Sequence, residues 1–356
     1  MRPLTGQDSE RTNYVIIADC AIDWIIRPND KQYSILSSAL LKEELQVHKD
    51  MNDKKAKAII RTVQNLSISH KRHFGGPIFN ISQYLQAARG QKVSVVSVIG
   101  TNKESEDYKN ALENIGVDTR CLLRREGTMP VCLYVYKDSE HQLPRVWRGN
   151  VSGEPYLPQS PFYNEFLNSH DVLVLAVANP KTAVVSIKNF VNTIAYNPGP
   201  YLKFFPFEQT RFTEIIPKTH ILSANKEETE VIKINLGLKQ MTELFQRYEG
   251  LEYIITTLGK DGSEIHKKDG QSYRYDPKED NKSINQKAIV DDVGAGDAYF
   301  ATALHYIMRG MNVSDIVMAA TRAAQQSLLH PSAVDIRLLK EDASPFPSII
   351  KVGNGH

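Results

Sequence analysis

The sequence has few cysteines and no long apolar segment, and each shortage excludes a class of protein. Its 356 residues include three cysteines, Cys20, Cys121 and Cys132, which form neither a C-x-x-C pair nor a metal-ligand pattern. This shortage excludes a disulfide-rich scaffold and predicts a reduced, cytoplasmic environment. The apolar run Val172–Ala178 is far too short to span a bilayer, and residues 1–12 lack the apolar core of a signal peptide. We therefore expect no membrane partner.

A large excess of charge of either sign is also absent. The 43 Lys and Arg residues nearly balance the 41 Asp and Glu residues, which gives a formal net charge of +2. Nothing global therefore attracts nucleic acid, and we expect no nucleic-acid partner. A hydrophobic content of 41% and a charged content of 24% are typical of a soluble globular protein.

Short apolar runs rich in Val and Ile recur between longer helical stretches. Because these runs lack the polar alternation of an exposed sheet, they predict a mostly parallel sheet that helices cover on both faces. The clearest runs are Tyr14–Ile17, Val93–Ile99, Val172–Ala178 and Tyr253–Thr256. Apolar residues at helical spacing predict helices over Glu104–Ile115 and Asp297–Met308.

One region has a different pattern. Val131–Tyr136 alternates between apolar and more polar residues, a charged turn follows, and a second strand-like run lies around Arg145–Trp147. This pattern predicts a hairpin with one wet face, projecting from the body as a flap. The charged, helix-prone stretch Asp30–Arg72 is interpreted as an insertion beside the flap.

The most informative segment surrounds a Gly-Ala-Gly turn that joins an apolar run to an amphipathic helix. Gly294 and Gly296 let the backbone approach a ligand closely, and unpaired N–H groups at the helix start favour an anion. Asp297 would lie beside that anion, where a carboxylate can accept a proton from an attacking hydroxyl. An ordinary helix start explains Gly and Asp equally well. The acidic pair Asp291-Asp292 and the order of strand, turn and helix favour the functional interpretation.

This segment resembles a known signature. Residues 291–297, Asp-Asp-Val-Gly-Ala-Gly-Asp, resemble the D-T-x-G-A-G-D motif of the ribokinase-like carbohydrate kinases, also called the phosphofructokinase B type. The mismatch is Asp292, where the family usually has Thr. The resemblance implies an α/β fold: a ribokinase-like three-layer sandwich with a mostly parallel central sheet and a small β-sheet lid. It also implies a kinase that uses ATP and Mg²⁺, with Asp297 as general base and an anion hole formed by Gly294, Ala295 and Gly296.

Further matches to the family concern the substrate. The Gly75-Gly76 pair and Asn80 resemble the family's Gly-Gly and Asn at a helix start, and the resemblance implies contacts with substrate hydroxyls. Asp23 matches an early family Asp that holds the same hydroxyls, although the family's Gly is replaced in this strand by Ala18-Asp19. A turn before a helix and an exposed Asp at a strand end remain the alternatives.

Two matches concern the nucleotide and the metal. Asn225 and Glu228 occupy the ends of an N-x-x-E motif, which implies that they organise Mg²⁺, largely through water, and that Asn225 lies near the nucleotide. A helix cap with acidic residues in its first turn is the alternative. Thr257, Gly259 and Gly262 fit the family's T-L-G-x-x-G loop, which implies nucleotide binding.

The resemblance extends over nearly the whole chain and implies its organisation. We expect a kinase domain over residues 13–330 and a lid formed by about 19–30 and 128–150, with a helical insertion at about 31–72. Residues 331–356 are expected to form a loosely attached tail. By analogy with the family, a homodimer through the lid is expected.

The expected reaction is ATP-dependent phosphorylation of a hydroxyl of a small sugar or sugar derivative. A nucleoside kinase resembling adenosine kinase is the first alternative, since the long separation between Asp23 and Gly75 is closer to that branch. The run Asn197-Pro198-Gly199-Pro200 resembles ribokinase instead. A non-catalytic protein that binds a metabolite is the second alternative, but such a protein would have no need of Asp297.

Overall fold

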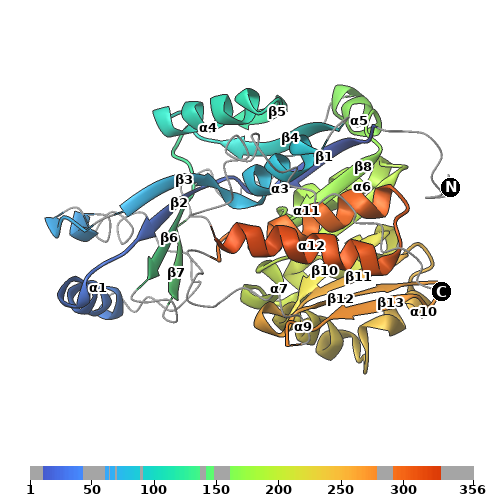
Figure 1. Cartoon of the computed structure of the whole chain (residues 1–356). Coiled ribbons are helices and arrows are strands. Elements are labelled where there is room, and N and C mark those ends of the chain that lie inside the picture. The colour runs from blue at the N-terminus through green and yellow to red at the C-terminus, as the bar shows by residue number, and fades with distance from the viewer. Residues whose placement is uncertain are drawn as a thin grey trace.

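A nine-stranded sheet forms the body of the protein (Figure 1). The computed structural model describes residues 11–42, 61–63, 65–68, 70–88, 91–136, 142–147, 161–278 and 292–329. The strands of the large sheet, in spatial order, are β13 (Ser272–Tyr275), β12 (Ser263–Lys267), β11 (Tyr253–Thr257), β10 (Ile221–Asn225), β9 (Thr193–Asn197), β8 (Val172–Ala176), β1 (Asn13–Ala18), β4 (Lys92–Ile99) and β5 (Asp118–Arg124).

Most strands of this sheet are parallel, and only β12 and β13 at one edge are antiparallel. Strand β1 shows why the sheet is covered on both faces. Its alternate residues Tyr14 and Ile16 enter one hydrophobic cluster, whereas Val15 and Ile17 enter another on the opposite face. A strand that is apolar on both faces is stable only between two layers of helices.

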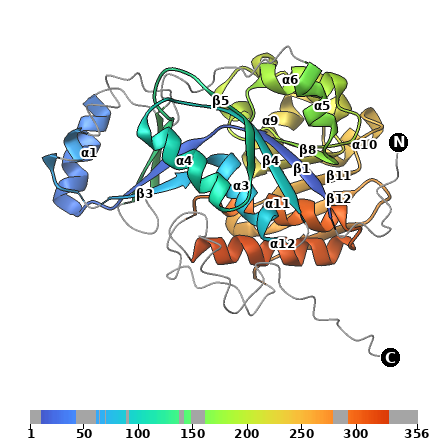
Figure 2. The same cartoon turned by 90° about the horizontal axis from the view of Figure 1, so that it is seen from above.

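Helices form those two layers, and Figure 2 shows α11 and α12 on one side of the sheet and α5 and α6 on the other. The first layer consists of α3 (Gly76–Ala87), α4 (Lys103–Asn114), α11 (Ala295–Met308) and α12 (Val313–Leu328). The second layer contains α5 (Pro161–Asn168), α6 (Pro180–Asn189), α8 (Phe212–Ile215), α9 (Lys226–Leu236) and α10 (Leu244–Arg247). The short helix α7 (Tyr201–Phe204) and four 3-10 turns complete the connections.

A separate four-stranded sheet projects from the body, and we call it the lid. Its strands, in spatial order, are β3 (His70–Gly75), β2 (Ala21–Ile26), β6 (Val131–Tyr136) and β7 (Gln142–Trp147). On one face, Trp24 and Ile26 belong to the same hydrophobic cluster as Leu36 of helix α1 (Asp30–Lys42). On the other face, Ile25 and Tyr136 pack against residue 293 of the body.

The predicted fold class is confirmed, and most predicted strands and helices begin and end within two residues of the observed ones. The second strand of the hairpin, β7, begins at Gln142, three residues before the predicted run. Strand β8 stops at Ala176 because Val177 adopts a positive φ of 51°, which no strand residue can have. The expectation of a wet face on the hairpin was wrong for Tyr136, which is 7% exposed because the body covers it. The expected tail, residues 331–356, lies outside the described residues, as do parts of the expected insertion and lid.

Two smaller expectations can be compared with the structure. None of the three cysteines, which all lie in the described ranges, forms a disulfide, and Cys20 and Cys121 are buried. Among helices in the described ranges, none combines the length and apolar composition needed to cross a membrane.

Candidate active site

The start of α11 forms an open cradle of backbone N–H groups. Gly294 precedes the helix with φ 83°, and the N–H of Ala298 donates to the Gly294 carbonyl over 2.9 Å. The N–H groups of Gly296 and Asp297 have no acceptor among the residues that the structure describes. A Cβ atom placed on Gly296 would meet no other atom within 4 Å, so the space in front of these groups is open. Such a helix start favours an anion.

Asp297 lies in the first turn of α11 and receives a single hydrogen bond from another helix. The amide Nδ2 of Asn80 donates to Oδ2 of Asp297 over 2.8 Å. Burial raises the pKa of Asp297 to about 6, and the hydrogen bond from Asn80 opposes this rise. The carboxylate is therefore ionised at neutral pH, yet it binds a proton much more readily than an ordinary aspartate does.

Asn80 has one amide atom in use and one available. It lies in α3 and is 3% exposed, and because a carboxylate can only accept, the NH₂ group must face Asp297. Its Oδ1 atom has no hydrogen-bond partner in the described part of the chain. An unmade buried acceptor costs about 1–3 kcal/mol, which a ligand hydroxyl would recover. Asn80 can therefore link Asp297 to a substrate.

Asp23 and the glycine pair meet at the start of α3, where lid strand β3 ends against β2. Asp23 is 2% exposed in strand β2, and a Cβ atom on Gly75 would lie 1.7 Å from its Oδ2 atom. Gly76 has φ 73°, and a Cβ atom there would lie 2.8 Å from the backbone oxygen of Asp19. Glycine is thus required at both positions. The alternative of an exposed Asp at a strand end is excluded, because β2 pairs on both sides within the lid.

Two tyrosines were missed as part of the site, because each occupies an ordinary apolar helix position in the sequence. The buried Tyr108 hydroxyl donates to the Gly75 carbonyl over 2.8 Å, and its ring packs against Phe74 and Phe79. This contact supports the glycine turn. Burial first, and then the nearby charge of Asp297, raises the pKa of Tyr84 to about 12.

The N-x-x-E residues form a complete capping box at the start of α9. Asn225 Oδ1 accepts from the Glu228 N–H over 2.9 Å, and both carboxylate oxygens of Glu228 accept from Asn225. Glu228 is buried, which raises its pKa to about 7. In the described ranges, no group of three or more His, Cys, Asp or Glu side chains could hold a metal directly. The exposed Asn225 and the carboxylate behind it fit a Mg²⁺ ion that keeps its waters.

The predicted nucleotide residues adjoin this capping box. Thr257 ends strand β11, and its Cα position pairs with Asn225 at the end of β10. Gly259 and Gly262 follow with φ values of 60° and 98°, and a Cβ atom on Gly262 would lie 2.0 Å from the Tyr275 carbonyl oxygen. The turn therefore needs glycine for its own shape, which is independent of any ligand.

A groove of about 580 Å³ adjoins this turn, and its lining includes Leu258 and Asp261. Its lining includes Lys226 and Lys233 of α9 but neither Asp297 nor Asn80. Some of its charged groups pair with each other, as Lys226 does with Asp261 and Lys233 with Glu230.

Comparisons with known proteins agree on family and fold. A family model described as pfkB family carbohydrate kinase matches residues 25–338. A nucleoside kinase from Methanothermobacter thermautotrophicus is 23% identical over 245 residues, which are 67% of this chain and 73% of that protein.

Two solved structures extend the comparison. An adenosine kinase from Schistosoma mansoni in complex with 2-fluoroadenosine has a TM-score of 0.72 at 16% identity, covering 91% of this chain and 96% of that one. A ribokinase from Cryptococcus neoformans var. grubii in complex with ADP has a TM-score of 0.63 at 15% identity, covering 95% and 97%. At these identities the structures show a common fold.

Proposed function

This chain belongs to the pfkB family of carbohydrate kinases, and we propose that it transfers the γ-phosphoryl group of ATP to a hydroxyl of a nucleoside or a related sugar. The family and the named relatives make it a small-molecule phosphotransferase of the ribokinase-like fold. The observation that carries the proposed chemistry is the hydrogen bond from Asn80 to Asp297, because it joins the Gly-Gly helix to the start of α11.

Asp297 is the proposed general base. Its Oδ2 atom accepts from Asn80, so Oδ1 is the oxygen that faces the acceptor hydroxyl. As the acceptor oxygen bonds to the γ-phosphorus, the bond between that phosphorus and the bridging oxygen breaks and ADP leaves. The hydroxyl proton moves to Asp297, whose raised pKa favours this transfer. The open N–H groups of Gly296 and Asp297 stabilise the charge on the phosphoryl oxygens.

The buried polar atoms of the lid and of α3 are proposed to hold the acceptor. Asn80 Oδ1 lacks a partner in the described ranges and can accept one substrate hydroxyl. The Asp23 carboxylate, packed on Gly75, can accept others. These two hydrogen-bond acceptors, one on a lid strand and one on α3, would fix the sugar ring of the substrate so that one hydroxyl faces Asp297.

Asn225 and Glu228 are proposed to hold Mg²⁺ through water near the triphosphate. When bound, the ion neutralises phosphate charge and orients the transferred group. The pairing of Asn225 with Thr257 supports this proposal, because it sets the proposed metal residues beside the proposed nucleotide turn.

The identity of the phosphoryl acceptor can be determined with a panel of nucleosides and free sugars. Each is incubated with ATP and Mg²⁺, and ADP production is the readout. The curated relatives are named nucleoside kinases, so we expect nucleosides to be phosphorylated more efficiently than free ribose. Asp297→Asn is the matched control and should show strongly reduced turnover with every member of the panel. Turnover of free sugars alone would reject the nucleoside preference, and equal turnover by Asp297→Asn would reject the base.

A further inference from the structure

The lid touches the anion cradle at Asp292, the one position that departs from the family motif. The hydroxyl of Tyr136, in lid strand β6, donates to Oδ1 of Asp292 over 3.1 Å. The backbone oxygen of Asp292 in turn accepts from the N–H of Ala295 over 3.4 Å, which closes the turn before α11. One residue thus connects the lid to the turn through its side chain and its backbone.

One further contact joins the lid to the turn, and a second, within the lid, holds Tyr136 in place. Val293, the next residue, packs with Ile25 and Tyr136 in a small buried cluster. The guanidinium of Arg27 lies over the Tyr136 ring, 4.8 Å from its centroid. A hydrogen bond to a charged acceptor, an apolar cluster and a cation–π contact therefore meet where β6 reaches the turn.

We propose that Tyr136 and Asp292 form a latch that positions the Gly294–Gly296 turn around the terminal phosphate of ATP. The turn needs such support, because Gly294 has φ 83° and glycine fixes its own backbone poorly. Asp292 also brings a negative charge close to a site for an anion, a cost in affinity that the contact with Tyr136 offsets. Tyr136 is thus a positioning residue that acts through the turn. The inference rests on the proposed function, since it assumes that the turn binds phosphate.

The test compares the affinities for ATP and ADP by calorimetry at fixed Mg²⁺, without an acceptor. ADP lacks only the terminal phosphate, so the ratio of the two affinities reports on the turn and not on general damage to the fold. We expect Tyr136→Phe to weaken ATP binding about ten-fold, while ADP binding stays within about two-fold. Asp292→Ala should weaken ATP binding by a smaller factor, because it removes the repulsion together with the hydrogen bond. The double variant should be no weaker than either single variant, because both remove the same bond.

Conservative variants separate the effect of the Tyr136–Asp292 hydrogen bond from the effect of the Asp292 charge. Asp292→Asn keeps an oxygen that can accept from Tyr136 and removes the repulsion, so it should bind ATP at least as tightly as the native protein. Tyr134→Phe removes a hydroxyl from the same face of the same strand and should leave both affinities unchanged. Native ATP affinity in Tyr136→Phe, additive losses in the double variant, or equal losses for ATP and ADP would each overturn the latch. Loss of turnover in Asp297→Asn with a native ATP/ADP ratio in Tyr136→Phe would overturn the latch and leave the proposed function intact.

Discussion

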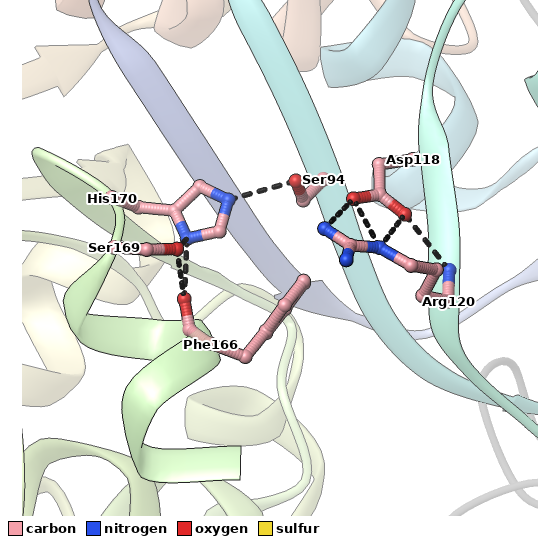
Figure 3. A network of polar contacts seen from close by, with 6 residues as sticks. All are labelled: Ser94, Asp118, Arg120, Phe166, Ser169 and His170. Carbon is pink, nitrogen blue, oxygen red and sulfur yellow. Dashed lines mark hydrogen bonds and ion pairs between the residues drawn. The ribbon is translucent and has the colours of Figure 1, made fainter. Parts of the chain in front are cut away.

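At the amino edge of the large sheet, by which we mean the side where its parallel strands begin, His170 has a hydrogen-bond partner for each ring nitrogen. At the carboxyl edge, where those strands end, the Oδ1 atom of Asn80 has no hydrogen-bond partner in the described part of the chain. Figure 3 shows the first arrangement: His170 Nδ1 lies 2.7 Å from the Phe166 carbonyl, and Nε2 lies 2.7 Å from the Ser94 hydroxyl. Because a carbonyl only accepts, Nδ1 carries the proton and Nε2 accepts from Ser94.

The two edges differ in whether their buried polar groups have hydrogen-bond partners within the protein. Burial lowers the pKa of His170, so the ring is neutral and its two hydrogen bonds are complete. Nothing is left for a ligand, and the group ties α5 to β4. At the carboxyl edge a buried amide oxygen and two N–H groups have no partner among the described residues. A polar network that is complete stabilises the fold, whereas an incomplete one is available for binding.

Removal of the proposed general base, Asp297, should have the largest effect on activity and tests the carboxyl edge directly. Asp297→Asn keeps an oxygen for Asn80 but cannot take the hydroxyl proton, so we expect turnover to fall by about 10²–10⁴-fold. Steady-state assays with the acceptor from the panel measure the loss, and calorimetry should show that ATP still binds. In the native protein, kcat/KM should fall as the pH drops below about 6, where Asp297 becomes protonated.

The same substitution should stabilise the fold. The folded-state pKa of Asp297, about 6, lies above the ordinary 3.8, so the folded state binds the proton more tightly than the unfolded chain does. The stability of the native protein therefore falls as the pH rises from about 4 to 6, and Asn avoids this cost. We expect urea unfolding to show a gain of about 1–3 kcal/mol for Asp297→Asn at pH 8, which disappears below pH 4. No gain at pH 8 would show that the carboxylate is well solvated.

A second variant tests the residue that links base and substrate. Asn80→Leu keeps the volume but removes both polar atoms, so we expect kcat/KM to fall by about 10–100-fold. Loss of the donated hydrogen bond also raises the pKa of Asp297 further, which should move the acid limb of the pH profile to higher pH.

Ser82→Ala provides the control for Asn80→Leu. Ser82 is fully buried in the same helix, and its hydroxyl has no partner within the described ranges. Its loss should leave both rate and pH profile unchanged. An unshifted acid limb in Asn80→Leu would show that Asn80 does not act on the base.

A substitution at the amino edge should change the free energy of unfolding but not the turnover. His170→Ala removes two buried hydrogen bonds and should cost about 2 kcal/mol in the free energy of unfolding, with kcat unchanged. Because burial lowers the pKa of His170, the unfolded chain takes up its proton first as the pH falls below about 6.5. The stability difference between native protein and variant should therefore shrink between pH 7 and pH 5. A loss of kcat at full folding would contradict the division between the two edges.

Sequence reasoning predicted the elements that repeat a simple period and missed the contacts between them. The apolar runs and the Gly-Ala-Gly turn identified the sheet and α11, because each feature is local. Asp23 is different: its burial follows from pairing of β2 with two strands that are distant in sequence. No local pattern contains that information, so the alternative of an exposed strand end stayed open.

The same limit explains the candidate site. Asn80 and Asp297 were each identified from motifs, but the hydrogen bond between them spans 217 positions and depends on how α3 packs on α11. Tyr108 and Tyr136 were interpreted only as residues of a helix and of a strand. The apolar periodicity of the sequence places the ring of a tyrosine, but it does not indicate which group its hydroxyl contacts.

The smallest effect should come from the capping box, which lies at the carboxyl edge but is complete like the His170 group. Glu228→Gln can still accept from the Asn225 N–H, so the helix start should survive while the negative charge disappears. Since the carboxylate would act on Mg²⁺ only through water, we expect the half-saturating Mg²⁺ concentration to rise by about three- to ten-fold, with kcat at saturating Mg²⁺ nearly unchanged. Glu243→Gln alters a second capping box, formed with Gln240, and should leave the Mg²⁺ dependence as it was. If both variants behave alike, Glu228 is a helix cap alone, and completeness of the hydrogen bonds decides the role of a polar group at either edge of the sheet.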